Sequence, residues 1–200
     1  YFNKAIKIKP DFHKAWFTLG TAYEVDNNLD SAIVKYEKAI ELNPGYTKAY
    51  SNLGNIRLIR KEYEEAKNIL LTAIQIDPTF SDAYLRLGVV YSEQELFIEA
   101  SEQFKKSTEY DEKNYDAWFR YASSLNSTDR YKEASISAQK CIDPKSKFGG
   151  GWYEKGVAEF KSGKKTRALK YFEEANKDRD WRKLAQRKID EINNPTKYQK

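Results

Sequence analysis

Apolar residues recur along this chain at intervals of three or four positions, in stretches that come in pairs. A short polar break separates the two stretches of a pair, as in "DNN" at 26–28 and "STD" at 127–129. Apolar positions spaced in this way lie on one face of an α-helix, and a polar break between two such stretches is typical of a turn. The pattern therefore predicts an all-α chain of consecutive helix pairs.

The helix pairs repeat with a constant step of 34 residues. Five segments align without a gap: "AWFTLGTAYE" (15–24), "AYSNLGNIRL" (49–58), "AYLRLGVVYS" (83–92), "AWFRYASSLN" (117–126) and "GWYEKGVAEF" (151–160). One slot is aromatic in every copy, at Trp16, Tyr50, Tyr84, Trp118 and Trp152. A slot in the second helix is always alanine, at Ala32, Ala66, Ala100, Ala134 and Ala168. Self-similarity at such a period indicates an array in which each repeat packs against its neighbours.

This pattern closely resembles the tetratricopeptide repeat (TPR), whose signature is W-x2-L-G-x2-Y, then A-x3-F, then Pro, at the same period. Trp16, Leu19, Gly20 and Tyr23 match the first block of that signature. The resemblance covers nearly the whole chain. It implies an all-α fold, a right-handed α-solenoid of tandem antiparallel helix pairs known as the TPR superhelix.

The register predicts a single TPR array over residues 1–192. We expect residues 1–12 to form only the second helix of a partial repeat, with one or more repeats upstream of it. Five repeats are predicted at 13–46, 47–80, 81–114, 115–148 and 149–182. Residues 181–192 are predicted to form a C-terminal capping helix whose apolar face carries Trp181, Leu184, Ala185, Ile189 and Ile192. Residues 193–200 are predicted to be a disordered tail.

Glycines stand at two kinds of position. One slot of the first helix holds Gly20, Gly54, Gly88 and Gly156. A glycine inside a helix costs roughly 1 kcal/mol relative to alanine, so we expect the partner helix to pass too close for a Cβ. Three consecutive glycines at 149–151 fill the first slots of the last repeat without changing its register. Since they weaken a helix start and Pro144 comes earlier than the other closing prolines, we predict a looser joint there.

The chain offers few groups for catalysis. His13 is the only histidine and Cys141 the only cysteine, so a zinc site is not predicted. The segment "GWYEKGV" lacks the Lys and Ser/Thr of a nucleotide-binding loop. We therefore expect no enzymatic activity, no cofactor and no metal. One cysteine also excludes an internal disulfide, which is consistent with a reducing compartment and favours a cytoplasmic location.

The resemblance implies a binding surface, because the first helices of successive repeats line the concave face of a TPR superhelix. Asn52 and Asn55 lie one helical turn apart, and each offers a donor and an acceptor to a peptide backbone. Arg86 and Arg120 share a slot, and a guanidinium group fits a carboxylate or a phosphate. The candidate residues for binding a peptide or partner are Phe17, Thr21, Lys48, Asn52, Asn55, Leu85, Arg86, Phe119, Arg120 and Tyr153.

One known activity of the family is not expected here. Co-chaperones of the family hold the C-terminal carboxylate of a chaperone with lysines, asparagines and an arginine on this face. Phe17 and Thr21 stand where that arrangement needs Lys and Asn, and Asp82 stands where it needs a second Lys. The resemblance therefore does not extend to a two-carboxylate clamp.

Composition and charge narrow the function further. The chain is 40% hydrophobic and 32% charged, which suits a thin two-layer helical array, and no stretch approaches the roughly 20 apolar residues of a membrane span. Of the net charge of +5, residues 141–200 contribute 16 Lys and Arg against 9 Asp and Glu. Such an excess favours acidic partners or nucleic acid, although lysines that solvate a helix surface explain it more simply.

The sequence therefore predicts a non-catalytic protein–protein interaction module or scaffold that binds a peptide segment or partner protein along its concave groove. The alternative is a substrate-recruiting or regulatory TPR arm of a larger multidomain enzyme. Self-association through the uncapped N-terminal helix is a third hypothesis. Nucleic-acid binding is not favoured, because the basic excess lies mainly in the last repeat and the cap.

Overall fold

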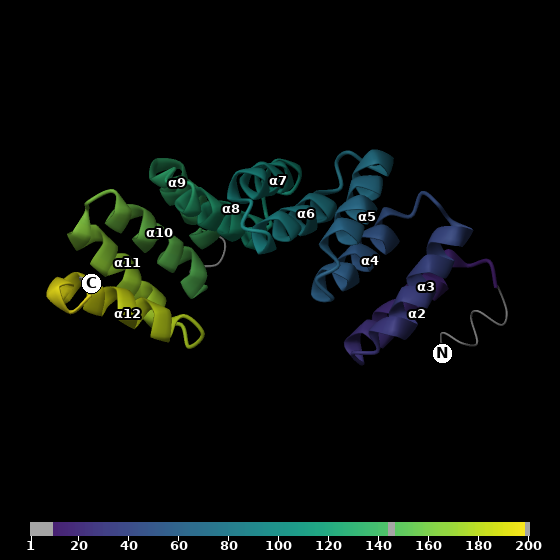
Figure 1. Cartoon of the computed structure of the whole chain (residues 1–200), viewed down its shortest axis with the longest axis horizontal. Helices are drawn as coiled ribbons and strands as arrows, with labels where there is room; N and C mark the ends of the chain where they lie inside the picture. Colours follow the sequence, from purple (N-terminus) through teal and green to yellow (C-terminus); the bar gives the residue numbers. More distant parts are fainter. Residues whose placement is uncertain (1–9, 144–146, 199–200) are drawn as a thin grey trace. The chain divides into compact units, whose positions relative to one another are not determined.

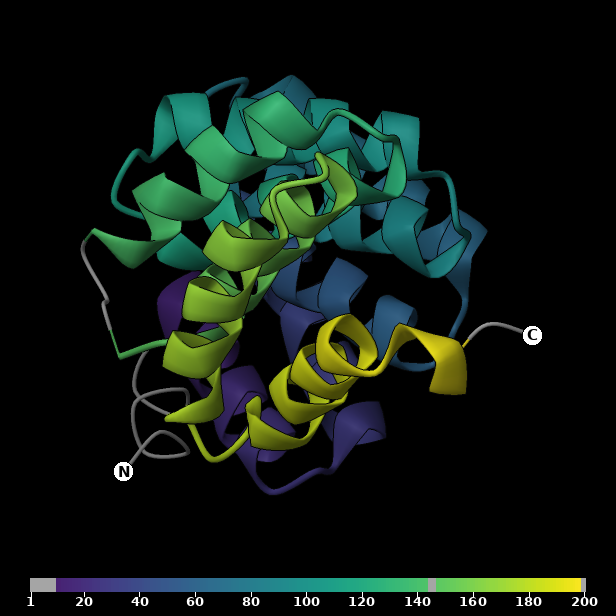
Figure 2. The ribbon, with the colours of Figure 1, turned by 90° about the vertical axis from the view of Figure 1, so that its left-hand side faces the viewer.

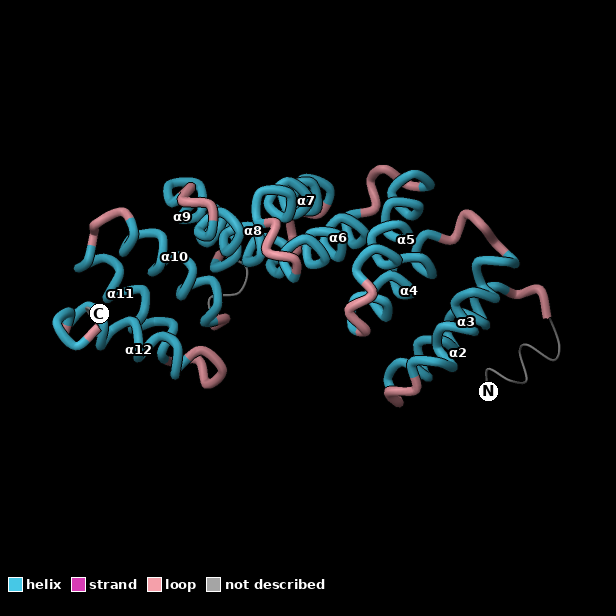
Figure 3. The backbone as a smooth tube through the Cα atoms, viewed as in Figure 1, coloured by secondary structure: helices cyan, strands magenta, loops and turns pink. Residues whose placement is uncertain are grey.

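The computed structural model describes residues 10–143 and 147–198. Within these residues the backbone forms eleven α-helices, one short 3-10 helix and no strand (Figures 1 and 3). The elements are α2 (His13–Val25), α3 (Leu29–Leu42), α4 (Thr47–Ile59), α5 (Tyr63–Ile76), α6 (Ser81–Glu93), α7 (Phe97–Tyr110), α8 (Tyr115–Ser127), α9 (Tyr131–Ile142), α10 (Gly149–Lys161), α11 (Lys165–Asn176), α12 (Arg182–Asn193) and η1 (Pro195–Lys197). The prediction of an all-α fold is confirmed.

Consecutive helices pack against each other as pairs, such as α2 with α3, α4 with α5, α8 with α9 and α10 with α11. The first helices of the pairs begin at residues 13, 47, 81, 115 and 149, so the step of the sequence is also the step of the helices. The chain divides into two compact units, residues 1–90 and 91–200, and the division falls within α6. The helix predicted at 1–12 falls largely on residues 1–9, which lie outside the described residues.

The turn inside each helix pair is closed in the same way five times among the described residues. Its central residue has a positive φ, which is 56° at Asn27, 62° at Lys61, 60° at Glu95, 60° at Asp129 and 82° at Gly163. The next backbone N–H donates to the carbonyl five residues earlier, as from Glu62 to Arg57 at 2.9 Å. These are the bonds of a Schellman motif, which satisfies carbonyls at a helix end. The polar breaks of the sequence are therefore helix C-caps.

The aromatic slot near the start of the first helices connects α2, α6 and α8 to the turns that precede them. The indole N–H of Trp16 donates to the carbonyl of Pro10 at 2.8 Å, and that of Trp118 donates to the carbonyl of Glu112 at 2.9 Å. The Tyr84 hydroxyl donates to the carbonyl of Pro78 at 3.1 Å. Trp and Tyr can pack an aromatic ring and also donate a hydrogen bond from its polar end, which Phe cannot do. This explains why the slot holds Trp or Tyr and never Phe.

Glycine in the first helix makes room for a large side chain of the second helix. A Cβ added to Gly20 would lie 2.6 Å from Cε1 of Tyr36, and one added to Gly54 would lie 2.8 Å from Cγ of Leu70. At Gly156 the nearest atom is Cε1 of Phe172, at 2.7 Å. The expectation that no Cβ fits there is confirmed at these three positions, but the crowding comes from a side chain and not from the partner helix backbone.

The three glycines at the start of α10 are buried in close packing. An added Cβ would lie 2.6 Å from Cβ of Asp178 at Gly149, 2.6 Å from Cζ of Phe148 at Gly150 and 3.0 Å from Sγ of Cys141 at Gly151. The backbone N–H of Gly149 also donates to Oδ2 of Asp178 at 2.7 Å. The predicted looseness falls partly on residues 144–146, outside the described residues. For the glycines themselves, the structure shows close packing that leaves no room for a Cβ.

Helix α12 packs on α11 at the C-terminal end of the chain, drawn in yellow in Figures 1 and 2. Ala185 and Ile192 are buried, but Leu184 is 46% exposed, so its assignment to the apolar face was wrong. Leu184 lies one residue before Ala185, and the helical rotation between them turns it away from α11. Within the tail predicted to be disordered, Pro195–Lys197 form the single turn η1.

Candidate peptide-binding surfaces

A hydrogen-bonded network joins the first three described helices of the first unit. The buried hydroxyl of Tyr36 donates to Oε2 of Glu24 at 2.6 Å. Asn52 Nδ2 donates to that hydroxyl at 3.1 Å, and Asn55 Nδ2 donates to the other oxygen of Glu24 at 3.3 Å. Burial and the Glu24 carboxylate raise the pKa of Tyr36 far above its usual range, so the hydroxyl keeps its proton. Both asparagines thus serve the fold, and their side-chain oxygens and second amide hydrogens remain for a ligand.

Next to this network is a pocket of about 230 Å³. Three predicted site residues line it, Phe17 from α2 and Lys48 and Asn52 from α4, together with Phe80 and Asp82. Phe17 is fixed by ring contacts, with its centroid 5.1 Å from that of Tyr46. The pocket thus has apolar walls, a lysine and a carboxylate.

Asp82 orients Arg86, the arginine of this unit that was predicted to bind a ligand. Its Oδ2 accepts from Ser51 Oγ at 2.5 Å and from Arg86 Nε at 3.0 Å. Within the described part of the chain, no carboxylate contacts the Nη atoms of Arg86. The guanidinium is therefore held by one edge, while the N–H groups of its outer edge can donate to a carboxylate or a carbonyl.

The second unit contains a comparable pocket of about 240 Å³ that Phe119 and Arg120 of α8 line. Arg120 Nε donates to Oδ2 of Asp116 at 3.0 Å, which is the geometry of Arg86 and Asp82 one repeat later. The remaining lining residues are two phenylalanines and four serines, namely Ser92, Phe97, Phe104, Ser123, Ser124 and Ser127. Sequence reasoning did not select these. In the sequence the second-helix phenylalanines are indistinguishable from core residues, while Ser92 and Ser123 belong to first helices, which the resemblance places on the concave face.

Besides Asn55 and Arg86, three of the predicted site residues line neither pocket. Thr21 Oγ1 donates to the carbonyl of Thr18 in its own helix at 2.8 Å, and Leu85 is half-buried on α6. Tyr153 packs between α11 and α12, with its ring centroid 5.6 Å from Phe172 and 5.3 Å from Trp181. Its surroundings are those of a core residue.

Glu154 is a buried carboxyl that sequence reasoning did not single out. Asn126 Nδ2 donates to its Oε2 at 2.8 Å and to its backbone carbonyl at 2.9 Å, which links α8 to α10. Burial raises the pKa of Glu154 to about 7, although the hydrogen bonds from Asn126 and Ser123 act in the opposite direction. This carboxyl is thus part charged and part neutral near pH 7.

No three His, Cys, Asp or Glu side chains gather as a metal site would need in residues 10–143 and 147–198. None of the described helices combines the length and the apolar character needed to cross a membrane.

Family models match the chain from residue 13 to residue 144. Models described as tetratricopeptide repeat match residues 13–46, 35–68, 81–114 and 115–144, and one described as TPR repeat matches residues 54–95. The chain belongs to the tetratricopeptide repeat family. A comparison with curated proteins finds no match to the sequence.

Several solved structures share the fold, one of them described as a TPR protein. YrrB, described as a TPR protein with an unusual peptide-binding site, is 22% identical over 93% of this chain and 96% of its own, with a TM-score of 0.74. MamA is 21% identical over 82% of this chain and 90% of its own, with a TM-score of 0.71. PilF of Pseudomonas aeruginosa is 21% identical over 88% of this chain and 80% of its own, with a TM-score of 0.77. At these identities the likeness shows the fold.

Tetratricopeptide arrays are typically non-catalytic modules that bind proteins or peptides, and the repeats make this chain a protein-interaction module.

Proposed function

We propose that this tetratricopeptide array binds an extended peptide segment of a partner protein on the first helices of its repeats. The observation that carries the proposal is a recurring pair of features: a small pocket with phenylalanine walls and, on the same first helices, an arginine whose Nε is held by an aspartate four residues earlier. Each unit contains such a combination among its described residues, at Asp82–Arg86 and at Asp116–Arg120.

The size of the pockets supports a peptide rather than a metabolite. Sites that enclose a drug-sized ligand usually measure roughly 300–1,000 Å³. At about 230 and 240 Å³, each pocket here is smaller and suits one side chain of a longer ligand. The fold relative YrrB is described as having a peptide-binding site, which agrees with this class of ligand.

The chemistry of the lining residues defines the peptide. Phe17 and Phe119 offer ring faces to apolar anchors of the ligand. Arg86 and Arg120 bind its acidic side chains or carbonyls through their free Nη edges. Asn52 and Asn55 contact its backbone with the amide hydrogens and oxygens that Tyr36 and Glu24 leave available.

The test is a peptide selected against the wild-type chain from a random library, with its affinity then measured by fluorescence anisotropy. We expect Arg86→Ala/Arg120→Ala to weaken binding by about tenfold or more, since the loss of one charge-assisted hydrogen bond corresponds to roughly 1.5–3 kcal/mol. The matched control is Arg60→Ala/Arg130→Ala, because these arginines also pair with carboxylates but line neither pocket. Equal affinities of the two double variants would contradict the proposal.

A further inference from the structure

A hollow of the second unit lies at the C-terminal end of the chain. It measures about 580 Å³ and is lined by the end of α11, the following turn, α12 and Tyr198. Four of its lining side chains are cationic, namely Arg179, Arg182, Lys183 and Arg187, and one is a carboxylate, Asp190. Neither Arg86 nor Arg120 contributes to it, so this basic pocket is separate from the surfaces described above.

The four cations have no ion-pair partner among the described residues. This sets them apart from neighbouring cations such as Lys177, which pairs with Glu174, and Lys188, which pairs with Glu191. Arg182 Nε instead donates to the backbone carbonyl of Asn176 at 3.3 Å. Its guanidinium is thereby held at the pocket without being neutralised.

The position of these cations on α12 is unfavourable for the isolated helix. Arg182 and Lys183 occupy its first turn, which contains no acidic residue. The N-terminal end of a helix carries a partial positive charge, so cations there are repelled and anions are attracted. The helix dipole and the four side chains therefore produce a positive potential in the same pocket, which an anion would relieve.

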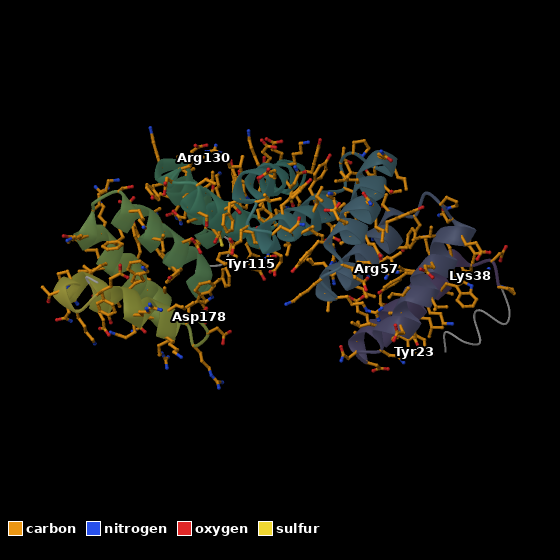
Figure 4. The ribbon with its side chains drawn as sticks, in the orientation of Figure 1. Tyr23, Lys38, Arg57, Tyr115, Arg130 and Asp178 are labelled. Carbon is orange, nitrogen blue, oxygen red and sulfur yellow. The ribbon has the colours of Figure 1, made fainter. Side chains whose placement is uncertain are left out.

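The boundaries of this positive region identify the kind of anion. Asp178 (Figure 4) and Asp180 belong to the turn before Arg182, and Asp190 of α12 lines the pocket itself. Carboxylates before and within the positive region would repel a polyanion that continued along the surface, as nucleic acid does, whereas a short acidic segment needs to contact the cations only. Gln186 adds an amide oxygen that accepts a peptide N–H, because its Nε2 is already committed to Asp190 Oδ1 at 2.9 Å.

We propose that the basic pocket is a second binding site, which takes a short glutamate- or aspartate-rich segment of a partner protein. The carboxylates of that segment lie on Arg179, Arg182, Lys183 and Arg187, with bidentate contacts at the arginines. Part of the basic excess of residues 141–200 thus lies in this pocket, and the proposal assigns it an acidic peptide as its ligand. This proposal does not depend on the peptide-binding surfaces of the first helices.

The experiment measures binding of a fluorescent peptide in which glutamate alternates with glycine to the full chain, by anisotropy at low and at physiological salt. Arg182→Glu/Arg187→Glu is expected to weaken binding by at least about tenfold, as the removal of bidentate charge-assisted contacts requires. The matched control is Lys161→Glu/Lys170→Glu, which makes the same change of charge at exposed helical lysines outside the pocket and should bind like wild type. Arg86→Ala/Arg120→Ala should also bind like wild type. Circular dichroism of each variant verifies the fold.

Several outcomes would overturn the proposal. One is the absence of binding by wild type at low salt, and another is an equal loss in the control variant, which would indicate unspecific attraction. A single-stranded oligonucleotide of similar length that bound as tightly, through the same arginines, would identify a general polyanion site. Dissociation of a dimer on Arg182→Glu/Arg187→Glu, observed by sedimentation, would show that a second copy of the chain occupies the pocket.

Discussion

Lys61 and Glu95 adopt a backbone conformation that glycine favours, with φ of 62° and 60°. The Schellman bond of each turn requires this conformation, which costs a residue with a Cβ about 1 kcal/mol or more. Asn27 and Asp129 occupy the same slot with side chains that tolerate it better, and only Gly163 carries no Cβ. Most repeats therefore hold, at this turn position, a residue other than the glycine that the backbone conformation favours.

Replacement of Lys61 by glycine should stabilise the first unit. We expect Lys61→Gly to raise the free energy of unfolding by about 1 kcal/mol, because the left-handed strain disappears. Urea denaturation monitored by circular dichroism measures this change. Gly163→Ala is the reciprocal control, since a Cβ there meets no atom within 4 Å and would add strain alone. A shift of both variants in the same direction would refute this explanation.

Glu154 makes the stability of the second unit depend on pH. Burial raises the pKa of its carboxyl from an ordinary 4.5 to about 7. Between these values the folded chain keeps a proton that the unfolded chain releases, so stability falls as pH rises through this window. Glu154→Gln removes the charge and retains an acceptor for Asn126. We expect it to exceed wild type in stability by about 1–3 kcal/mol near pH 8 and to match it near pH 4.5.

Denaturant unfolding at the two pH values checks this prediction. Asp143→Asn, a change of the same charge at an exposed carboxyl, serves as the control and should show a much smaller pH-dependent gain. If Glu154→Gln were no more stable than wild type at the higher pH, the carboxyl would be ionised without cost in the folded chain.

Asn52 and Asn55 show what a sequence can and cannot disclose about a site. Their spacing placed them on one face of a helix, and the structure agrees. Their bonds to Tyr36 and Glu24 depend on which side chains α3 and α2 bring near, which spacing alone does not give. A signal was present, because Tyr36 has a hydroxyl in a slot that holds Leu70 or Phe104 in later repeats, and a buried hydroxyl needs a partner.

At the scale of the helix, the start of α10 is where packing outweighs propensity. Three glycines in the first turn make a poor helix by intrinsic preference. However, the Asp178 carboxylate accepts a hydrogen bond from the N–H of Gly149. The rings of Phe148 and Trp181 occupy the space that a Cβ of Gly150 would need. The sequence showed the weak propensity correctly, and the close approach of these neighbours could only come from the structure.

Gly149→Ala distinguishes the two effects. Helix propensity alone would stabilise α10 by about 1 kcal/mol. The added Cβ would instead lie 2.6 Å from Cβ of Asp178 and 3.0 Å from the backbone carbonyl of Ala175, which cannot rotate away. We expect a net loss of about 1–3 kcal/mol, as overpacking usually costs, measured by thermal unfolding. Gly45→Ala, whose Cβ would meet only Asn43 Oδ1 at 3.4 Å, should be nearly neutral, and a stabilised Gly149→Ala would contradict the packing argument.

At the scale of the whole chain, the period of the sequence predicted most of the architecture. A strict step fixed the register of the helix pairs, because the same slots must meet the same partners in each repeat. It could not show that the chain divides into two compact units within α6, since equal repeats contain no mark of that division. The sequence also gave the amount of basic charge, but it did not show where that charge is concentrated. Arg179 and Arg187 line the same pocket only because the turn between α11 and α12 places α12 on α11.

The indole bonds at the helix starts provide the chain with its own optical reporters. Trp16 is the only tryptophan of the first unit, while Trp118, Trp152 and Trp181 belong to the second. Trp16 and Trp118 each donate to a turn carbonyl, so their emission changes when that turn opens to water. Arrays of repeats can lose their ends before their middle. Replacement of the three later tryptophans by phenylalanine would leave a spectrum in which the unfolding of the first unit alone is followed.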